Sequence, residues 1–217
     1  MMQRSAEIRW FWKSNPPPGL EEWFKSEKTH GCVPGGGVTP RTDLYRRETK
    51  QVELAIKLRG NKPGYEVKGL VEQLALLSVA PFTGPVELWT KWSTDGLKFD
   101  AQELIPTTKL RWIRKLDTTG AKPREVELGP DETAKSGNVV LESGCQVELT
   151  QIHIRDETWW SFSFESFGTI ATVERDLHAA AAVMAKRGPP ALSGGILASY
   201  PAWLKDRLAE NGGASHF

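Results

Sequence analysis

The sequence predicts an α+β protein in which an antiparallel β-sheet closes into a barrel around a charged channel, with helices packed outside it. Several stretches alternate ionised residues with large apolar ones, which is the period of a β-strand. Their ionised faces carry both signs of charge, and this favours an enclosed polar lumen over a water-facing sheet. After Gly168 the apolar residues recur instead at helical spacing, so helices follow the sheet.

The alternation is clearest in three stretches, at residues 6–13, 52–59 and 107–116. Their ionised members are Glu7, Arg9, Lys13, Glu53, Lys57, Arg59, Lys109, Arg111 and Lys115. Their large apolar neighbours are Ile8, Trp10, Trp12, Val52, Leu54, Ile56, Leu58, Leu110 and Trp112. Large rings on the second face are suited to packing on the outside of a barrel, under helices.

The first half of the chain reads as strands separated by strong turns. The strand over 6–13 ends at Asn15-Pro16-Pro17-Pro18-Gly19, and a short helix is expected over 20–28. Residues 31–40 contain four glycines and two prolines and are expected to be a loop. Strands over 43–47, 52–59 and 65–70 follow, the last two joined by a turn at 60–64, so these three form a meander.

The second half continues with strands over 85–93, 107–116 and, more weakly, 124–128. Thr94-Asp95-Gly96 closes the first of these with a hairpin signal. The clearest hairpin joins 145–154 to 158–167 through a turn at 155–157. The helical spacing runs over 170–187 and stops at Gly188-Pro189-Pro190, and a last helix is expected over 201–210.

Composition restricts the partners. The chain has 217 residues, 28 Lys+Arg against 27 Asp+Glu, and a formal net charge of +1, so charge does not draw it to nucleic acid or membrane, and neither is expected. No apolar run approaches the ~20 residues of a membrane span. Cys32 and Cys145 lack the spacing of a zinc site or a disulfide framework. We expect one cytoplasmic domain over residues 1–217, with the oligomeric state left open.

The charged face would concentrate its residues in a confined volume. Nine basic and six acidic residues share it: Glu7, Arg9, Lys13, Glu53, Lys57, Arg59, Glu66, Lys68, Glu87, Lys91, Lys109, Arg111, Lys115, Glu148 and Glu165. In a closed barrel such charges must be paired, hydrated or saturated by a ligand. The excess of cations predicts a polyanion, and a phosphate chain suits the planar fork of Arg and the compact charge of Lys.

The order of the short strands resembles the CYTH superfamily, the triphosphate tunnel metalloenzymes. The resemblance extends over nearly the whole chain and depends on these segments: Glu7-Ile8-Arg9-Trp10-Phe11-Trp12-Lys13, Thr42-Asp43-Leu44-Tyr45, Lys57-Leu58-Arg59-Gly60, Tyr65-Glu66-Val67-Lys68, Lys109-Leu110-Arg111-Trp112, Val147-Glu148-Leu149 and Phe162-Ser163-Phe164-Glu165-Ser166-Phe167-Gly168. It implies a barrel of about eight strands around a tunnel, and hydrolysis of triphosphate or polyphosphate with Mg²⁺ or Mn²⁺.

The predicted site residues combine this resemblance with the charge pattern. The phosphate-binding candidates are Arg9, Lys13, Lys57, Arg59, Lys68, Lys91, Lys109 and Arg111. The candidate ligands of a single Mg²⁺ or Mn²⁺ are Glu7, Glu148 and Glu165. No catalytic base is identifiable.

The chain departs from the family at its acidic positions. The family's first strand alternates two glutamates and a lysine, whereas here Arg9 stands where the second glutamate is expected. The two acidic pairs near the C-terminus each retain one acid, Glu148 with Thr150 and Glu165 with Ser163. Arg cannot ligate a cation, which puts a metal site in question. Three functions stay open: metal-dependent hydrolysis of a triphosphate or polyphosphate, binding of a polyphosphate, nucleotide or other anion without turnover, or a structural protein whose inner charges are mutually paired.

Overall fold

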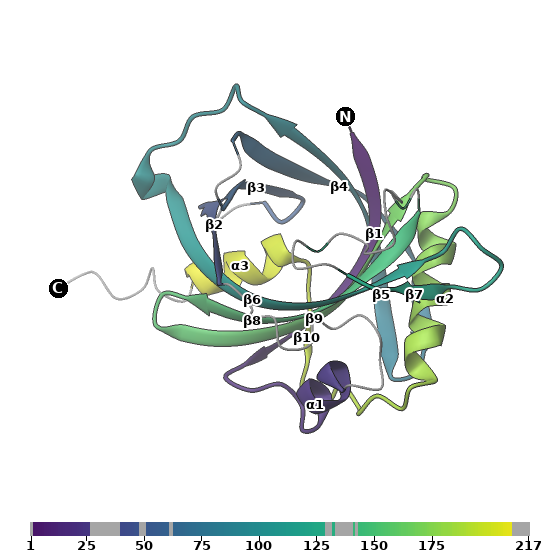
Figure 1. Cartoon of the computed structure of the whole chain (residues 1–217). Helices are drawn as coiled ribbons and strands as arrows, with labels where there is room; N and C mark the ends of the chain where they lie inside the picture. The colour runs from purple at the N-terminus through teal and green to yellow at the C-terminus, as the bar shows by residue number, and fades with distance from the viewer. Residues whose placement is uncertain are drawn as a thin grey trace.

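Eight antiparallel strands close into a barrel in the computed structural model of the chain, which describes residues 2–26, 40–47, 51–60, 63–128, 132, 141 and 143–209. Around the ring the order is β1-β5-β4-β3-β2-β6-β8-β9, and β9 pairs with β1 to close it (Figure 1). The strands are β1 (Gln3–Lys13), β2 (Arg41–Arg46), β3 (Leu54–Arg59), β4 (Tyr65–Val79), β5 (Phe82–Thr94), β6 (Leu104–Asp117), β8 (Gly144–Ile154) and β9 (Glu157–Gly168). The predicted fold class is confirmed.

Two short strands and a 3₁₀ turn lie next to the eight barrel strands. β7 (Arg124–Val126) pairs with the end of β6, and β10 (Ile196–Leu197) adds to β1 opposite Trp10 and Phe11. The turn η1 (Ala101–Glu103) precedes β6. β10 was not predicted, because its two residues are too few to show a period.

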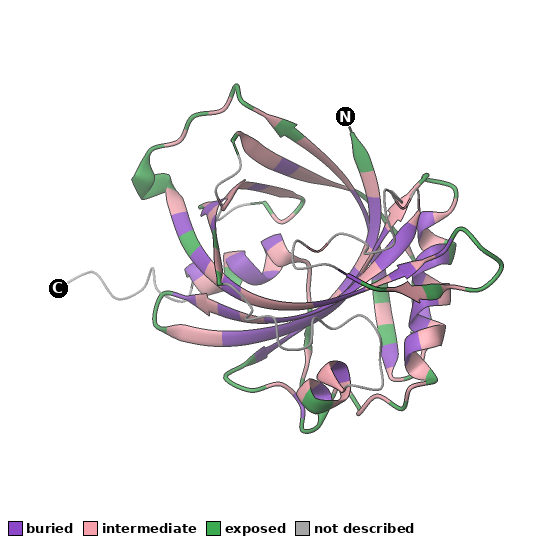
Figure 2. Cartoon of the chain, in the orientation of Figure 1, coloured by how far each residue is buried: buried purple, intermediate pink, exposed green. Residues whose placement is uncertain are grey.

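The apolar faces of the strands form the larger core outside the barrel, under α2 (Val173–Ala185) and α1 (Leu20–Lys25). Ile8 and Trp10 of β1 pack there with Phe162 of β9, and Leu177 and Met184 of α2 belong to the same cluster. Figure 2 shows buried residues on the side of α2 that meets the strands. The predicted outward packing of the large rings is therefore confirmed for this wall.

The last helix, α3 (Tyr200–Ala209), lies across one end of the barrel, and Figure 1 shows it within the outline of the ring. Trp203, Leu204 and Leu208 form a second cluster with side chains from the inner faces of the strands. The strand members of this cluster are Phe11, Tyr45, Ile105, Ile152, Ile154 and Trp159. This end of the lumen is therefore filled with hydrocarbon.

The meander β2-β3-β4 and the hairpin β8-β9 are confirmed, but the hairpin signal at residues 94–96 was wrong. β5 pairs with β4 and β1, whereas β6 pairs with β2 and β8. The actual hairpin turns at Ala80-Pro81, and β4 is much longer than predicted, because residues 71–79 lack the alternation that marks the barrel strands. This extension lies beside α2, where Ala75 N donates to a carboxylate oxygen of Glu174 at 3.2 Å. None of the described helices is both long and apolar enough to cross a bilayer.

Candidate functional site

Closure of the barrel gathers charged side chains from distant parts of the chain into one cavity of about 140 Å³. Register places them there, because directly paired residues of antiparallel strands point to the same face. Glu7 lies opposite Glu165, Arg9 opposite Ser163, and Lys57 opposite Glu66. The lining residues are Glu7, Arg9, Arg41, Tyr45, Ala55, Lys57, Arg59, Glu66, Lys68, Lys91, Lys109, Arg111, Gln146, Glu148, Thr150, Ser161, Glu165, Tyr200 and Pro201.

Cations outnumber carboxylates in this lining by eight to four. Seven of the eight predicted phosphate-binding residues belong to it, and so do all three predicted metal ligands. The eighth, Lys13, lies elsewhere. It follows Phe11 on the inner side of β1, but its side chain is 55 % exposed and pairs with Glu157 at 2.6 Å. The hydrocarbon around α3 separates it from the cavity.

The part of the cavity next to α3, here called the floor, consists of Arg9, Arg41, Asp43, Tyr45, Lys57, Lys109 and Tyr200. Lys109 lies at its centre, only 7 % exposed at the side chain. Its ammonium group donates to Tyr45 Oη at 2.7 Å, contacts Asp43 at 3.4 Å and stands 4.1 Å from the ring centroid of Tyr200. The two tyrosine rings stack at 4.8 Å, so the floor is rigid.

Electrostatics at the floor favour an anion. Burial lowers the pKa of Lys109 well below its usual range, and the nearby Lys57 lowers it further. Burial opposes ionisation of Asp43, but Lys109, Lys57 and Arg41 outweigh burial and lower its pKa. Asp43 is therefore an anion shared between Arg41 and Lys109. Arg41 and Lys109 share this one carboxylate, while Lys57 and Arg9 also contact Glu66 and Glu148. A bound anion would relieve the repulsion between these cations.

The outer half of the cavity, farther from α3 along the strands, is a set of ion pairs. Its members are Glu7, Arg59, Glu66, Lys68, Lys91, Arg111, Glu148 and Glu165. Lys68 donates to both carboxylate oxygens of Glu7. Arg111 donates to Glu148 Oε2 through Nε at 3.0 Å and Nη2 at 2.6 Å. Four cations and four carboxylates thus balance here, and Arg111 also donates to Glu132, outside the lining, at 2.9 Å.

The same pairs explain the pKa values of the outer carboxyls. Burial raises the pKa of Glu66, but Lys57 and Lys91 outweigh it and lower the pKa to about 2. Burial likewise opposes ionisation of Glu165, and Lys68 and Lys91 bring its pKa to about 2. Arg111 and Arg9 hold the pKa of Glu148 well below its usual range despite its burial. All three are anions at neutral pH.

The donor set for a divalent cation fits poorly. Glu7 and Glu165 face each other across β1 and β9, and Glu148 lies on the next strand, so the sheet does bring the predicted ligands together. Each of them, however, is already held by Lys or Arg, and Arg9 Nη1 lies 3.8 Å from Glu148. No three acidic, His or Cys side chains of the described segments are grouped to hold a metal. A metal would have to displace cations that are part of the wall.

Several residues in the lining, and Asp43 directly behind it, were not predicted as site residues. Asp43 and Tyr45 alternate with Leu44 on β2, so the period of two could have placed both on the lumen face. Arg41 has the same parity. Tyr200 belongs to α3, and no local sequence signal indicates that this helix meets the lumen.

No protein-family model matches this chain, and no curated protein matches it either. The resemblance to the CYTH superfamily therefore stays a prediction that depends on strand order and on individual charged residues.

Proposed function

We propose that this protein binds a triphosphate or short polyphosphate, free or attached to an organic group, inside the barrel. One observation carries the proposal: cations from six strands, β1 to β6, converge on one cavity in which they outnumber carboxylates by eight to four. Such an arrangement is costly unless an anion with several charges completes it.

A phosphate chain suits the geometry better than a single small anion. The cations line both the floor and the outer half. Lys109 and Arg111 are two positions apart on β6, which is roughly 7 Å along the strand. Arg9, Arg59 and Arg111 offer planar forks for phosphate oxygens. A linear anion can contact both levels at once, which a monophosphate cannot.

The carboxylates of the outer half act as counter-ions that a ligand replaces. Glu7, Glu66, Glu148 and Glu165 form ion pairs with Lys68, Lys57, Arg111 and Lys91 around the lumen. Side chains already ordered in this way lose little conformational entropy on binding.

Hydrolysis of the bound triphosphate is the second candidate function. The observation in its favour is that Glu7 and Glu165 are directly opposed in the β1–β9 register and both face the cavity. When bound, Mg²⁺ or Mn²⁺ would neutralise phosphate charge there. The poor fit of the donor set places this function behind binding alone.

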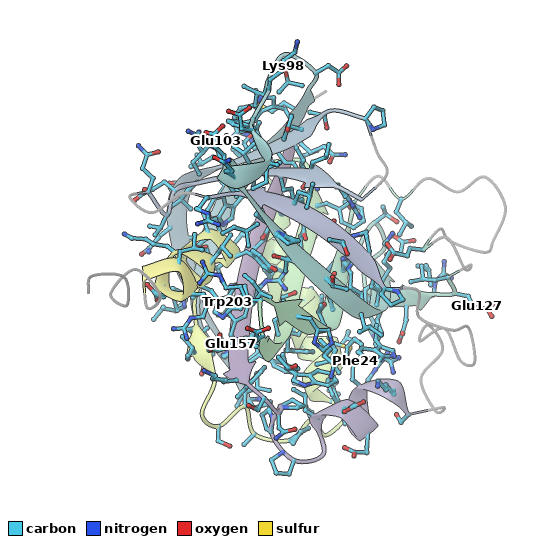
Figure 3. All side chains as sticks on the ribbon, turned by 90° about the vertical axis from the view of Figure 1, so that its left-hand side faces the viewer. Phe24, Lys98, Glu103, Glu127, Glu157 and Trp203 are labelled. Carbon is cyan, nitrogen blue, oxygen red and sulfur yellow. The ribbon has the colours of Figure 1, made fainter. Side chains whose placement is uncertain are left out.

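Binding is tested by titrating tripolyphosphate into the protein by calorimetry, without metal. Lys57→Met should weaken binding roughly tenfold or more, because one charge-assisted hydrogen bond is worth about 1.5–3 kcal/mol. Glu66 would keep Arg59 as a partner at 3.9 Å in this variant, so the fold should survive. Lys98→Met is the matched control, since this lysine lies exposed in the β5–β6 loop, far from the cavity (Figure 3). Equal affinities of both variants and the native chain would overturn the proposal.

Turnover is tested separately by measuring phosphate release from tripolyphosphate with Mg²⁺ or Mn²⁺. Glu165→Gln should abolish any release that this protein catalyses, whereas Glu157→Gln, outside the cavity, should leave it unchanged. Metal-dependent release that survives Glu165→Gln would indicate a contaminating enzyme. Ligand binding without release identifies a binding protein.

We also propose a cytoplasmic location. Cys145 supports it, because its thiol is buried and free, as expected in a reducing compartment. Cys32 lies outside the described residues.

A further inference from the structure

The lumen of this barrel is blind. Beyond the floor, Trp203 of α3 stacks on Phe11 of β1 with ring centroids 4.7 Å apart and meets the edge of Trp159 at 5.6 Å. Figure 3 shows Trp203 on the side of α3 that faces the strands. Leu204 and Leu208 complete this apolar layer, in which every member is at least nine-tenths buried. Within the part of the chain that the structure describes, this layer blocks the lumen at the α3 end, so a ligand would enter from the opposite end.

The positive charge is also unevenly distributed along the lumen. In the outer half the cations Arg59, Lys68, Lys91 and Arg111 are matched by Glu7, Glu66, Glu148 and Glu165. At the floor, Arg41 and Lys109 share one carboxylate, Asp43, whereas Lys57 pairs with Glu66 at 3.0 Å and Arg9 lies 3.8 Å from Glu148. Two cations at the closed end thus share a single buried carboxylate.

Two hydroxyl donors accompany these cations. Tyr45 Oη accepts a hydrogen bond from Lys109, so its own proton is free to be donated. Tyr200 Oη is buried and has no well-formed hydrogen bond among the described residues, although its ring lines the cavity. Burial raises the pKa of both phenols well above the usual range, so both remain protonated donors. Tyr45 is its neighbour, and because the contact between the two hydroxyls is not a well-formed hydrogen bond, Tyr200 can donate to another acceptor.

A terminal phosphate is the group that matches this floor. It carries close to two negative charges near neutral pH, with a second pKa of about 6, whereas an internal or diesterified phosphate carries one. It also presents three oxygens instead of two. We infer that the cavity recognises the free end of a polyphosphate chain, with the terminal phosphate at the floor against Lys109, Tyr45 and Tyr200 and the rest of the ligand toward the outer half. This inference rests on the proposed polyphosphate binding and narrows its ligand to linear chains with a free end.

The test compares ligands of equal charge that differ in having a free end. Adenosine diphosphate has one free phosphate end, whereas trimetaphosphate is a ring and diadenosine triphosphate is capped at both ends. At about pH 8, well above the second phosphate pKa of ~6, all three carry the same formal charge. Calorimetric titration of the full chain should give an affinity for adenosine diphosphate that is about tenfold tighter than for the other two ligands. A ratio of this size corresponds to one charge-assisted hydrogen bond.

Tyr200→Phe keeps the ring packing and removes only the hydroxyl. It should weaken adenosine diphosphate and tripolyphosphate severalfold and leave trimetaphosphate unchanged. Tyr65→Phe is the control, because Tyr65 does not line the cavity and packs on Phe99.

The failures are distinguishable. If no polyanion binds, the proposed function itself is wrong. If the ring and the capped ligand bind as tightly as adenosine diphosphate, and Lys57→Met weakens all three while Tyr200→Phe weakens none, then polyphosphate binding stands and end recognition is overturned.

Discussion

At the residue scale, Arg9 has the largest consequence for function. Its guanidinium donates to Ser161 Oγ at 3.0 Å, lies 3.8 Å from Glu148 and stands over the ring of Tyr200. It therefore adds positive charge at the position where the resemblance would predict a second glutamate, and under the proposed function it favours an anion over a metal ion at this wall.

Arg9→Glu should reverse this preference. A carboxylate at position 9 would add a fourth acid to Glu7, Glu148 and Glu165 on the lumen face and would remove the guanidinium that lies 3.8 Å from Glu148. We expect Mn²⁺ to raise the melting temperature of this variant but not of the native chain, and tripolyphosphate affinity without metal to fall at least tenfold. Arg4→Glu, at the half-buried second residue of β1, makes the same charge change outside the cavity lining and should do neither. If Mn²⁺ failed to stabilise Arg9→Glu, this account of the residue would be contradicted.

Lys109 makes binding dependent on pH. Burial and Lys57 lower its pKa in the free protein, and a bound phosphate would raise it again, so binding takes up a proton. Affinity should therefore fall as pH rises from the lowered pKa toward the pKa in the complex. Calorimetry in two buffers of different ionisation enthalpy, repeated at several pH values from about 8 upward, where the ligand with its second pKa of ~6 no longer titrates, measures this uptake. The uptake should vanish in Lys109→Met and persist in Lys98→Met; the same uptake in both variants would assign the proton to another group.

At the scale of elements, α3 has two roles that its sequence does not distinguish. Its apolar face closes the lumen, and its first turn contributes Tyr200 and Pro201 to the cavity. Trp203→Ala should lower the free energy of unfolding by about 3–5 kcal/mol, the usual cost of truncating a buried aromatic residue, and Trp203→Phe by clearly less. Urea unfolding followed by circular dichroism measures both. A loss below about 1 kcal/mol for Trp203→Ala would mean that α3 does not seal the barrel.

At the scale of the whole molecule, stability depends on carboxylates held inside the ring. The pKa values of Glu66 and Glu165 are about 2 in the folded protein against 4.5 for the unperturbed group. Their contribution is therefore fully present above about pH 4.5 and is lost as the pH falls toward 2. The free energy of unfolding, measured with urea over this range, should decrease with falling pH. Glu66→Gln should have a smaller free energy of unfolding at neutral pH, and this free energy should decrease less with falling pH than in the native chain. Glu72→Gln, exposed on β4, should change neither property. Parallel pH curves for both variants and the native chain would contradict this assignment.

The charged and apolar faces of the strands were predictable because side-chain direction alternates along any strand. This local rule identified the strands around Arg9, Lys57 and Lys109 and the hairpin β8-β9. Seven of the eight predicted phosphate-binding residues do line the cavity. It also identified the outer core under α2. It failed at residues 71–84, where the β4-β5 hairpin leaves the barrel and no alternation marks its course.

Only the tertiary structure decided what the charges meet. Lys13 satisfies the same alternation as Arg9 but lies beyond Phe11, on the other side of the layer formed with Trp203, so it is excluded from the cavity. Tyr200 enters the lumen because a helix more than thirty residues after β9 crosses the barrel end. The physical reason is that alternation depends on neighbours within one strand, whereas the partners of a buried charge and the closed end of a lumen depend on contacts between distant segments.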